Sequence, residues 1–141
     1  GVRFSTPICF EDVFGYLNAG FVANGADVIV NMTNDGWSKA VSAQMQHLGL
    51  AIFRSIENRR STVRGTNSGM TAVITPTGKI VGMMEPFKVG WKIYDVPVYT
   101  GEHHGFTFYT KHIDWFAFGS IYLSIALLVF GVIRSVVRKR R

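Results

Sequence analysis

Residues 2–32 read VRFSTPICFEDVFGYLNAGFVANGADVIVNM, and the pattern in this stretch decides the fold. Val2–Ile8 is rich in strand-forming residues, and Phe14–Asn24 carries apolar residues at helical spacing until Gly25 ends the run. Ala26–Met32 is a short apolar run with β-branched residues, which is typical of a strand buried on both faces. The sequence therefore predicts a strand, a sharp turn, a helix and a second strand.

The chain after this stretch continues with a loop and a second helix. Thr33–Ser38 is polar and reads as a loop, whereas Val41–Arg59 is the strongest candidate for an amphipathic helix. The apolar stripe predicted to face the core comprises Met45, Leu48, Ile52 and Ile56.

Short strands are expected next, with a hairpin turn at Pro76-Thr77-Gly78. The predicted strands are Ser61–Arg64, Met70–Thr75, Lys79–Met84 and Gly90–Val96. Strands that alternate with helices and then return as a hairpin indicate an α/β layered domain with a mixed sheet.

A long apolar segment follows a loop-rich tether predicted at Pro97–Asp114. Trp115–Ile133 reads WFAFGSIYLSIALLVFGVI, 19 residues without a charge, close to the ~20 that cross a bilayer core as a helix. We predict one transmembrane helix at residues 113–137; a buried core helix is the alternative. Aromatic residues before and at the start of the segment are expected to contact lipid headgroups: Phe106, Phe108, Tyr109 and Trp115.

The net charge of +6 is concentrated after this segment. Five of the six charges belong to Arg134, Arg138, Lys139, Arg140 and Arg141. The rest of the chain has no basic face, which argues against nucleic-acid binding. Because positive residues stay on the cytoplasmic side, we expect residues 138–141 to form a cytoplasmic tail and residues 1–112 to lie outside, in the periplasm of a bacterium. Specific binding of anionic lipid by the cluster is the alternative to a topology anchor.

Cys9 is the single cysteine, which excludes an internal disulfide framework and a cysteine-based zinc site. It lies where the first predicted strand gives way to a turn. A turn there lifts the thiol above the sheet edge, the nearby helix start favours the thiolate, and the next backbone N–H helps to stabilise an oxyanion. The alternative is a small buried hydrophobic residue.

Four motifs, in order along the chain, resemble the nitrilase (carbon-nitrogen hydrolase) superfamily. Pro7-Ile8-Cys9-Phe10-Glu11 is similar to the nucleophile motif of that superfamily. The other three are Asn31-Met32-Thr33-Asn34-Asp35-Gly36-Trp37, Arg54-Ser55-Ile56-Glu57-Asn58-Arg59-Arg60, and Thr66-Asn67-Ser68-Gly69 with Thr75-Pro76-Thr77-Gly78-Lys79-Ile80. With an apolar C-terminal segment behind such a domain, the chain resembles the C-terminal part of the apolipoprotein N-acyltransferase branch.

The resemblance implies an αββα sandwich, of which residues 1–112 form the C-terminal part without the N-terminal part. It also implies a Glu-Lys-Cys triad, in which the glutamate is the general base, the lysine supports the tetrahedral intermediate and the cysteine forms an acyl thioester. Only the nucleophile carries over, as Cys9, because the other two residues lie upstream in this superfamily and residues 1–8 contain neither Glu nor Lys. We therefore expect the chain alone to be catalytically incomplete, as a fragment or as one part of a divided gene product.

Further site residues follow from the same motifs. Phe10, which stands where that branch has tyrosine, is expected to offer its backbone N–H to the oxyanion. Glu11 either supports the active site by holding a polar partner near the thiol or is an acidic residue in the first turn of a helix. Trp37 and Asn34 are the candidates for substrate binding, Trp37 as a wall of an acyl-chain or lipoprotein pocket or as simple packing. Asn34 and Asp35 are expected to shape their turn through hydrogen bonds from side chain to backbone.

Other polar residues are interpreted as structural. Glu57, Arg60 and Arg64 are expected to pair in a network, and His47 is read as a satisfied helix histidine. The remaining candidates for metal ligands lack the usual spacing of a metal site: Glu102, His103, His104 and His112. No metal and no organic cofactor are expected, because the thioester itself conserves the reactivity of the acyl group.

The function that the resemblance implies is membrane-bound acyl transfer. An acyl chain would pass from a phospholipid to Cys9, and then to the N-terminal amine of a bacterial apolipoprotein, in a ping-pong reaction at the inner membrane. The full-length protein would cross that membrane several times. Two alternatives remain open: a catalytically incomplete, membrane-tethered module with the same fold, and an amidase or nitrilase that acts on another substrate.

Overall fold

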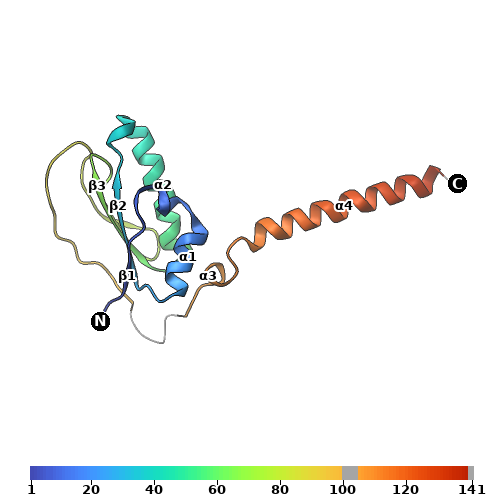
Figure 1. Cartoon of the computed structure of the whole chain (residues 1–141), viewed down its shortest axis with the longest axis horizontal. Coiled ribbons are helices and arrows are strands. Elements are labelled where there is room, and N and C mark those ends of the chain that lie inside the picture. Colours follow the sequence, from blue (N-terminus) through green and yellow to red (C-terminus); the bar gives the residue numbers. More distant parts are fainter. Residues whose placement is uncertain (100–104, 140–141) are drawn as a thin grey trace.

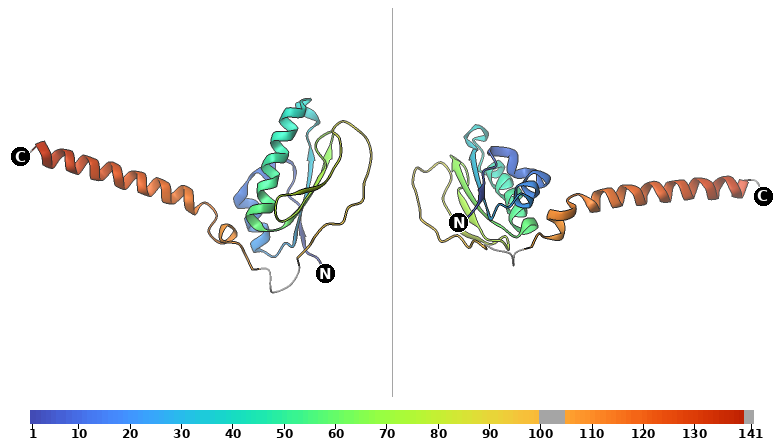
Figure 2. Two further views of the ribbon diagram at one scale, coloured as in Figure 1. Left: turned by 180° about the vertical axis from the view of Figure 1, so that it is seen from behind. Right: turned by 60° about the horizontal axis from the view of Figure 1, so that its bottom comes forward.

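The computed structural model describes residues 1–99 and 105–139. They form one mixed sheet, two longer helices that lie on the same face of the sheet, and a last helix that projects away from the domain (Figure 1). The two helices on the sheet are α1 (Gly15–Ala23) and α2 (Val41–Asn58). Figure 2 shows the same layering from behind and from below, with the helices between the sheet and the projecting helix. The predicted α/β fold is confirmed, and the described residues supply one sheet and one helical layer of the predicted sandwich.

The sheet contains five strands in the order β1-β2-β3-β4-β5, the same order as in the sequence. Strands β1, β2 and β3 run parallel to one another, and the β3–β4 and β4–β5 pairs are antiparallel. The strands are β1 (Phe4–Ser5), β2 (Val28–Asn34), β3 (Ser61–Asn67), β4 (Ala72–Ile74) and β5 (Ile80–Met83). The predicted hairpin is therefore present, as β4 and β5.

The register of the parallel strands places three loops at one edge of the sheet. Val28 pairs with Ser61 and the pairing continues to Asn34 opposite Asn67, so β3 is longer than predicted. An isolated parallel bridge between Ile8 and Met32 extends the β1–β2 pairing up to Cys9. Because parallel strands end at the same edge, the chain after Ile8, after Asn34 and after Asn67 meets there.

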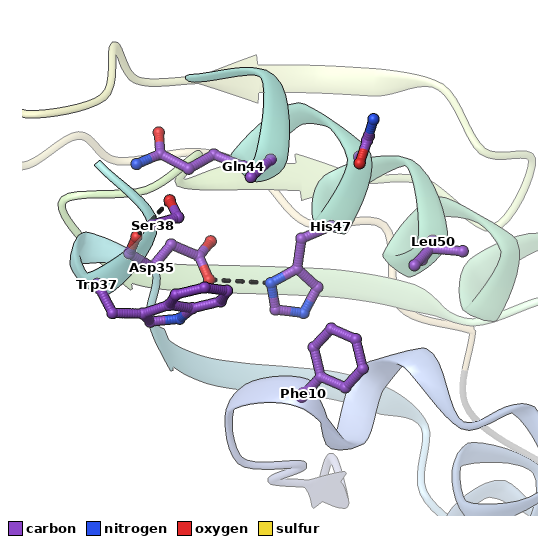
Figure 3. A pocket seen from close by; sticks show the side chains of 9 residues that line it. Phe10, Asp35, Trp37, Ser38, Gln44, His47 and Leu50 are labelled. Atoms are coloured by element: carbon purple, nitrogen blue, oxygen red, sulfur yellow. Dashed lines mark hydrogen bonds and ion pairs between the residues drawn. The ribbon is translucent and has the colours of Figure 1, made fainter. Parts of the chain in front are cut away.

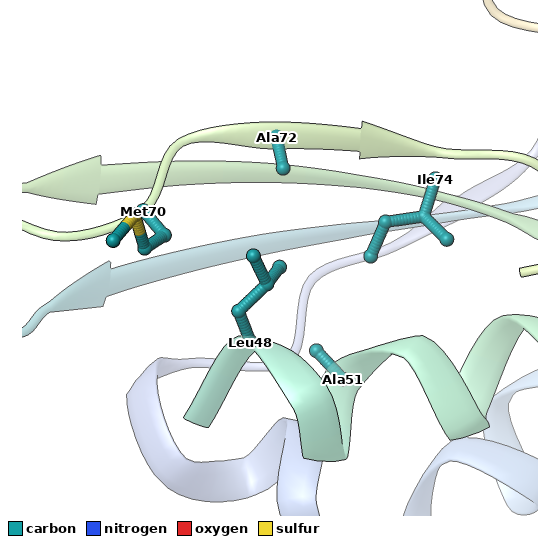
Figure 4. Close-up of a cluster of buried hydrophobic side chains, with 5 residues drawn as sticks. All are labelled: Leu48, Ala51, Met70, Ala72 and Ile74. Carbon is teal, nitrogen blue, oxygen red and sulfur yellow. The ribbon is translucent and has the colours of Figure 1, made fainter. Parts of the chain in front are cut away.

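Helix α2 (Val41–Asn58) carries the hydrophobic core, to which Leu48 and Ile52 of the predicted stripe contribute. Leu48 and Ala51 pack against a cluster from the hairpin (Figure 4) that comprises Met70, Ala72 and Ile74. Met45 and Ile56, which were predicted to face the core, are exposed. The buried face instead mixes apolar with polar residues: Gln44, His47, Leu48, Ala51, Arg54, Ser55 and Asn58. The apolar stripe was an incomplete guide because five of these seven buried residues are polar.

The chain between Cys9 and the second strand forms two helices. A 3-10 helix, η1 (Cys9–Val13), comes directly after the first strand region, and α1 (Gly15–Ala23) follows it. A second short 3-10 helix, η2 (Gly36–Ser38), lies in the loop after β2. The predicted order of strand, turn, helix and strand is confirmed.

The prediction of a strand at Gly90–Val96 was wrong. In the described part of the chain this segment has no strand pairing, and Trp91 and Ile93 are almost fully exposed. Tyr94 instead lays its ring over Gly82, where a Cβ would clash with the ring. The segment passes the edge strand β5, and the contact described there is made by the Tyr94 side chain, whose hydroxyl donates to the carbonyl oxygen of Met83 (3.3 Å).

The predicted tether contains a helix, α3 (Phe108–His112), docked on the end of α2. Thr107 caps α3 by accepting from the N–H of Thr110 (2.9 Å), and its hydroxyl donates to the carbonyl oxygen of Glu57 (2.5 Å). The Thr110 hydroxyl donates to Oδ1 of Asn58 (2.9 Å). These hydrogen bonds hold the end of the tether against the domain. The prediction of a loop-rich tether did not include this helix or its contacts.

The aromatic residues around α3 divide between two environments. Phe108 stacks edge-on against Trp115, with ring centroids 5.3 Å apart, and both side chains are exposed. Tyr109 turns inward, with its hydroxyl against Gly15, where a Cβ would not fit. Burial raises the pKa of the Tyr109 phenol, with a further rise from the nearby Glu57 carboxylate. Tyr109 is therefore a domain contact, contrary to its predicted place among the lipid headgroups.

Helix α4 (Trp115–Lys139) is 25 residues long and exposed along its whole length. The mean hydropathy of its most apolar window is 2.3, and among the described residues it is the one helix long and apolar enough to cross a membrane. The predicted apolar C-terminal helix is thus present.

Candidate active site

Cys9 occupies a strained turn at the edge where the parallel strands end. Its φ is +53°, in the left-handed region that residues other than glycine seldom adopt. The side chain is partly buried, and Cys9 is the first residue of η1, directly after the Ile8–Met32 bridge. Because such a conformation costs of order 1–3 kcal/mol, neighbouring contacts must hold it in place.

Asn31 supplies the first of these contacts from the middle of β2. Its side-chain amide is fully buried and donates to the carbonyl oxygens of Pro7 (3.1 Å) and Cys9 (3.0 Å). One Nδ2 group therefore holds the main chain on both sides of Ile8, and it fixes the carbonyl that follows the strained φ of Cys9.

Glu11 closes the same turn through the backbone. Its Oε2 accepts from the N–H of Ile8 (2.7 Å), and its own N–H donates to the carbonyl oxygen of Ile8 (3.1 Å). This arrangement agrees with the interpretation of Glu11 as an acidic residue in the first turn of a helix. The hydrogen bond that the structure describes for its carboxylate is to the main chain, and through it Glu11 supports the position of Cys9.

Phe10 follows Cys9 and lies half exposed over the helical layer. Its ring centroid is 5.1 Å from that of His47 and 6.3 Å from that of Phe14. The ring is thus held from α2 while the main chain of Phe10 stays in the first turn of η1, next to the thiol.

A buried cluster of four ionisable side chains lies directly beneath this turn. Its members are Asp12, Asp35, His47 and Arg64, which come from η1, the loop after β2, α2 and β3. His47 Nε2 lies 2.7 Å from Oδ1 of Asp12, and its Nδ1 lies 2.9 Å from Oδ1 of Asp35. Arg64 donates to Oδ2 of Asp12 and, at 3.0 Å, to Oδ2 of Asp35. The two carboxylates are therefore bridged twice, once by the imidazole and once by the guanidinium.

These contacts determine the direction in which the pKa of His47 is shifted. Burial lowers the pKa of His47, but the hydrogen bond and charge of Asp12, aided by the bond to Asp35, outweigh both burial and the repulsion by Arg64. The pKa of His47 is consequently raised above its usual value. With His47 protonated, two positive and two negative charges balance inside a closed site, which is the condition under which buried charges are tolerated.

The loop after β2 was expected to be shaped by Asn34 and Asp35. The expectation holds for Asn34, whose Oδ1 accepts from the N–H of Gly36 (3.0 Å). It was wrong for Asp35, whose carboxylate binds the side chains of His47 and Arg64. The parallel register explains the difference, because it brings the end of β2 beside β3, which carries Arg64.

A cavity of about 200 Å³ opens between this loop and α2 (Figure 3). Trp37, Phe10 and Leu50 supply apolar walls, and His47 lies at its floor. Trp37 is 74% exposed, so its indole covers the cavity without being packed into the core. The structure thus places Trp37 beside Phe10 at a cavity, whereas Oδ1 of Asn34 accepts from the N–H of Gly36 and from Nδ2 of Asn67 at the end of β3 (3.2 Å).

The predicted network of Glu57, Arg60 and Arg64 was wrong in its partners. Glu57 pairs with Arg54 (2.9 Å), and burial raises the pKa of the Glu57 carboxyl despite that partner. Arg60 donates to the carbonyl oxygen of Ala26 (3.2 Å), and Arg64 belongs to the cluster beneath Cys9. The partners of Arg64 come from η1 and from the loop after β2, which are distant from it in the sequence.

His47 is satisfied, as predicted, but its role in the cluster with Asp12 was missed. The available signal was the spacing of polar residues along α2, where Gln44, His47, Arg54 and Asn58 recur at helical intervals on one face. Polar residues at core positions indicate buried partners, because an unpaired polar group in the core is costly.

Metal binding finds no support in the described residues. They contain no group of three or more His, Cys, Asp or Glu side chains that could hold an ion. His112 lies against Phe108, with ring centroids 4.5 Å apart. Glu102, His103 and His104 lie outside the described residues.

Comparison with known proteins places this site in a family. The family model described as carbon-nitrogen hydrolase matches residues 1–102. The chain is 43% identical over 142 residues to Apolipoprotein N-acyltransferase 1 of Treponema pallidum, covering 100% of this chain and 25% of that protein. It is 34% identical over 142 residues to Apolipoprotein N-acyltransferase of Thermotoga maritima, covering 97% of this chain and 26% of that protein. The chain therefore spans about a quarter of the length of these curated relatives.

Solved structures show the same fold at low sequence identity. A carbon-nitrogen hydrolase from Helicobacter pylori matches with a TM-score of 0.54 at 9% identity, over 60% of this chain and 37% of that one. A mutant amidase from Nesterenkonia sp. AN1, with acrylamide added at its active-site cysteine, matches with a TM-score of 0.52 at 20% identity, over 61% of this chain and 37% of that one. The resemblance read from the four motifs is confirmed, and this chain belongs to the carbon-nitrogen hydrolase family.

Proposed function

We propose that this chain is the nucleophile-bearing part of a membrane-bound N-acyltransferase. Its acyl donor is a phospholipid, and its acceptor is the N-terminal amine of a bacterial apolipoprotein. The observation that carries the proposal is the turn of Cys9, a thiol held at φ +53° at the edge where the parallel strands end. The names of the relatives that match the whole chain support the type of reaction.

The first half-reaction forms a thioester. The sulfur of Cys9 attacks the ester carbonyl carbon of the phospholipid, the C–S bond forms, the ester C–O bond breaks, and the lysophospholipid leaves with a proton. The backbone N–H of Phe10 lies in the first turn of η1, where amide groups have no partner within the helix, and we assign it to the oxyanion.

The second half-reaction restores the thiol. The acceptor amine attacks the thioester carbon, the N–C bond forms, the C–S bond breaks, and a proton returns to Cys9. The general base and the lysine come from the part of the protein upstream of Cys9, as the family resemblance implies. We therefore expect residues 1–141 alone to form no product.

The cavity lined by Phe10, the residue after Cys9, suits the end of an acyl chain. Phe10, Trp37 and Leu50 give it apolar walls, and its volume of about 200 Å³ lies below the ~300–1,000 Å³ of a site that encloses a whole drug-sized ligand. We assign Trp37 to the wall that the chain contacts. Asn34, the other predicted binding residue, supports this wall through the N–H of Gly36.

The placement at the membrane follows from α4. We propose that residues 113–137 span the inner membrane, with the basic residues 138–141 in the cytoplasm and residues 1–112 in the periplasm. The exposed rings of Phe108 and Trp115 at one end and the basic residues Arg138 and Lys139 at the other support this orientation. An anchored domain meets both acylated substrates within the same plane.

The test uses the complete natural protein in membrane vesicles that contain phospholipid and a diacylated apolipoprotein. Wild type is expected to accumulate a hydroxylamine-labile acyl adduct on Cys9, seen by peptide mass, and to acylate the acceptor amine. Cys9→Ala is expected to lose both signals, while Ser42→Ala, an exposed change on α2, keeps both. Continued N-acylation by Cys9→Ala overturns the proposal, and release of free fatty acid or another acid in place of transfer favours the hydrolase alternative.

A further inference from the structure

We infer that His47 and Arg64 are positioning residues that tie the turn of Cys9 to the loop of Trp37. They do so by bridging Asp12 and Asp35, and the four side chains together are called the clasp. This inference rests on the proposed function only in taking Cys9 as the reacting group. It adds an assignment for four residues that acyl transfer by itself does not require.

The clasp joins the two walls of the cavity. Asp12 lies three positions after Cys9 in η1, and Asp35 lies two positions before Trp37. Asp12 is separated by 35 residues from His47 and by 52 from Arg64, so the contacts exist only in the folded domain. A change in the clasp therefore moves the nucleophile turn relative to the indole wall.

A purely structural role does not account for this set of residues. Asp12 and Arg64 are fully buried, and such ion pairs are often replaceable by apolar residues with no loss of stability. On the same face of α2 as His47, Leu48 and Ala51 are buried by apolar packing. Charged groups differ from apolar ones because their hydrogen bonds are directional. Two carboxylates that share two cations are therefore fixed in orientation as well as in distance.

The protonated imidazole completes the clasp. Both ring nitrogens face carboxylate oxygens, Nε2 at 2.7 Å and Nδ1 at 2.9 Å, and Nη2 of Arg64 lies 2.8 Å from Nδ1. A protonated ring donates to both carboxylates, whereas a neutral ring keeps one of these two bonds and its other nitrogen is left to accept from Arg64. The charged groups facing the ring are Asp12 from η1, Asp35 from the loop after β2 and Arg64 from β3. On α2 itself, Arg54 is directed to the carbonyl oxygen of Val13 and to Glu57.

This geometry has a consequence for pH. The pKa of His47 is raised in the folded protein, so the doubly bonded ring is present below that pKa and is lost as pH rises through it. Above the folded-state pKa, Arg64 alone bridges the two carboxylates, and the turn of Cys9 is held less firmly.

The experiment measures the turn directly, by the rate at which iodoacetamide alkylates Cys9 in the complete natural protein in detergent. Peptide mass spectrometry isolates Cys9 from other thiols, and pH is varied from about 6 to 9, a range that brackets an ordinary histidine. The variants are His47→Gln and Asp35→Asn, with Ser42→Ala on the same helix as the matched control. Thermal melts establish which variants are folded at each pH.

We expect His47→Gln to alkylate about threefold to tenfold faster than wild type at pH 6, which corresponds to roughly 0.7–1.4 kcal/mol. The ratio of the two rates falls toward one as pH rises, because wild type then loses the same bridge. Asp35→Asn shows the same direction, and Ser42→Ala matches wild type throughout. A merely structural role shows in the thermal melts and leaves the alkylation rate of the folded variants equal to that of wild type at every pH.

Two results overturn the inference. One is a folded His47→Gln or Asp35→Asn protein whose Cys9 alkylates as in wild type at every pH. The other is an altered rate whose ratio to wild type is constant with pH. If His47→Gln does not fold, Asp35→Asn decides the question. Failure of the proposed acyl transfer shows separately, as N-acylation that persists in Cys9→Ala, and leaves the alkylation result standing.

Discussion

The side-chain amide of Asn31 lies 3.0 Å from the carbonyl oxygen of Cys9 and fixes the turn on which the proposed chemistry depends. The same nitrogen also binds the carbonyl oxygen of Pro7, on the other side of the turn. A buried amide on β2 thus stabilises a left-handed conformation 22 residues away in the sequence.

Replacing Asn31 by Ala is expected to release the Cys9 turn. Two carbonyl oxygens lose their donor, which costs about 1–3 kcal/mol of folding free energy. Chemical denaturation of the complete protein measures the loss, and the acyl adduct on Cys9 falls with it. Asn24→Ala is the matched control, because the Asn24 amide binds the exposed carbonyl of Gly20 and its loss should cost less than ~0.5 kcal/mol. Equal costs for the two variants contradict the role of Asn31.

Leu48→Ala tests the packing of α2 on the hairpin. Leu48 is almost fully buried against Ala72 and Ile74, so truncation leaves a cavity and costs about 2–5 kcal/mol. The midpoint of thermal unfolding reports the change. Val41→Ala on the exposed side of the same helix should change the midpoint little. A loss for Leu48→Ala no greater than that for Val41→Ala would show that the core lies elsewhere.

Trp37→Ala separates substrate binding from folding. The indole is 74% exposed, so stability should change by less than ~0.5 kcal/mol. The KM for a long-chain phospholipid donor is expected to rise about threefold to tenfold, as for the loss of ~0.7–1.4 kcal/mol of binding. Trp91→Ala removes another exposed tryptophan far from Cys9 along the chain and serves as the control. An unchanged KM removes Trp37 from the binding site.

The contribution of His47 to stability should depend on pH in one direction. A folded-state pKa raised above the unfolded value stabilises the protein fully below the unfolded pKa of about 6.5. That contribution is lost as pH rises through the folded-state pKa. The difference in unfolding midpoint between wild type and His47→Gln is therefore largest at pH 6 and shrinks at higher pH. A difference that grows with pH would mean that the ring is buried in its neutral form.

The orientation of α4 can be tested with reporters fused after Arg141 of the complete protein. A cytoplasmic C-terminus predicts an active fluorescent-protein fusion and an inactive alkaline phosphatase fusion, because the phosphatase needs an oxidising compartment. Replacing the basic residues after Ile133 by Gln is expected to lower the fraction with this orientation. An active phosphatase fusion on the natural sequence would place the tail outside.

Local patterns in the sequence determined much of the fold. The strand, turn, helix and strand around Cys9, the hairpin at Pro76-Thr77-Gly78 and the apolar helix at the C-terminus were all predicted. Each depends on neighbours a few positions apart, which is the range over which periodicity, turn residues and runs of apolar side chains act. The four motifs also sufficed for the family, because their order along the chain is itself sequence information.

The tertiary structure decided which polar residues meet. The partners of Arg64 follow from the register of β2 against β3, and the contact of Asp12 with His47 follows from the way η1 packs on α2. The spacing of polar residues along α2 marks His47 as a candidate for burial, but it does not name the partner, and the sequence grouped Arg64 with Glu57. The unpaired segment at Gly90–Val96 is the converse case, since its strand-like pattern meets the edge strand β5 through the Tyr94 side chain and not through main-chain pairing. Helices and strands are determined by residues that are close together in the sequence. Contacts between residues 35 or 52 positions apart depend on how those helices and strands pack in the folded protein.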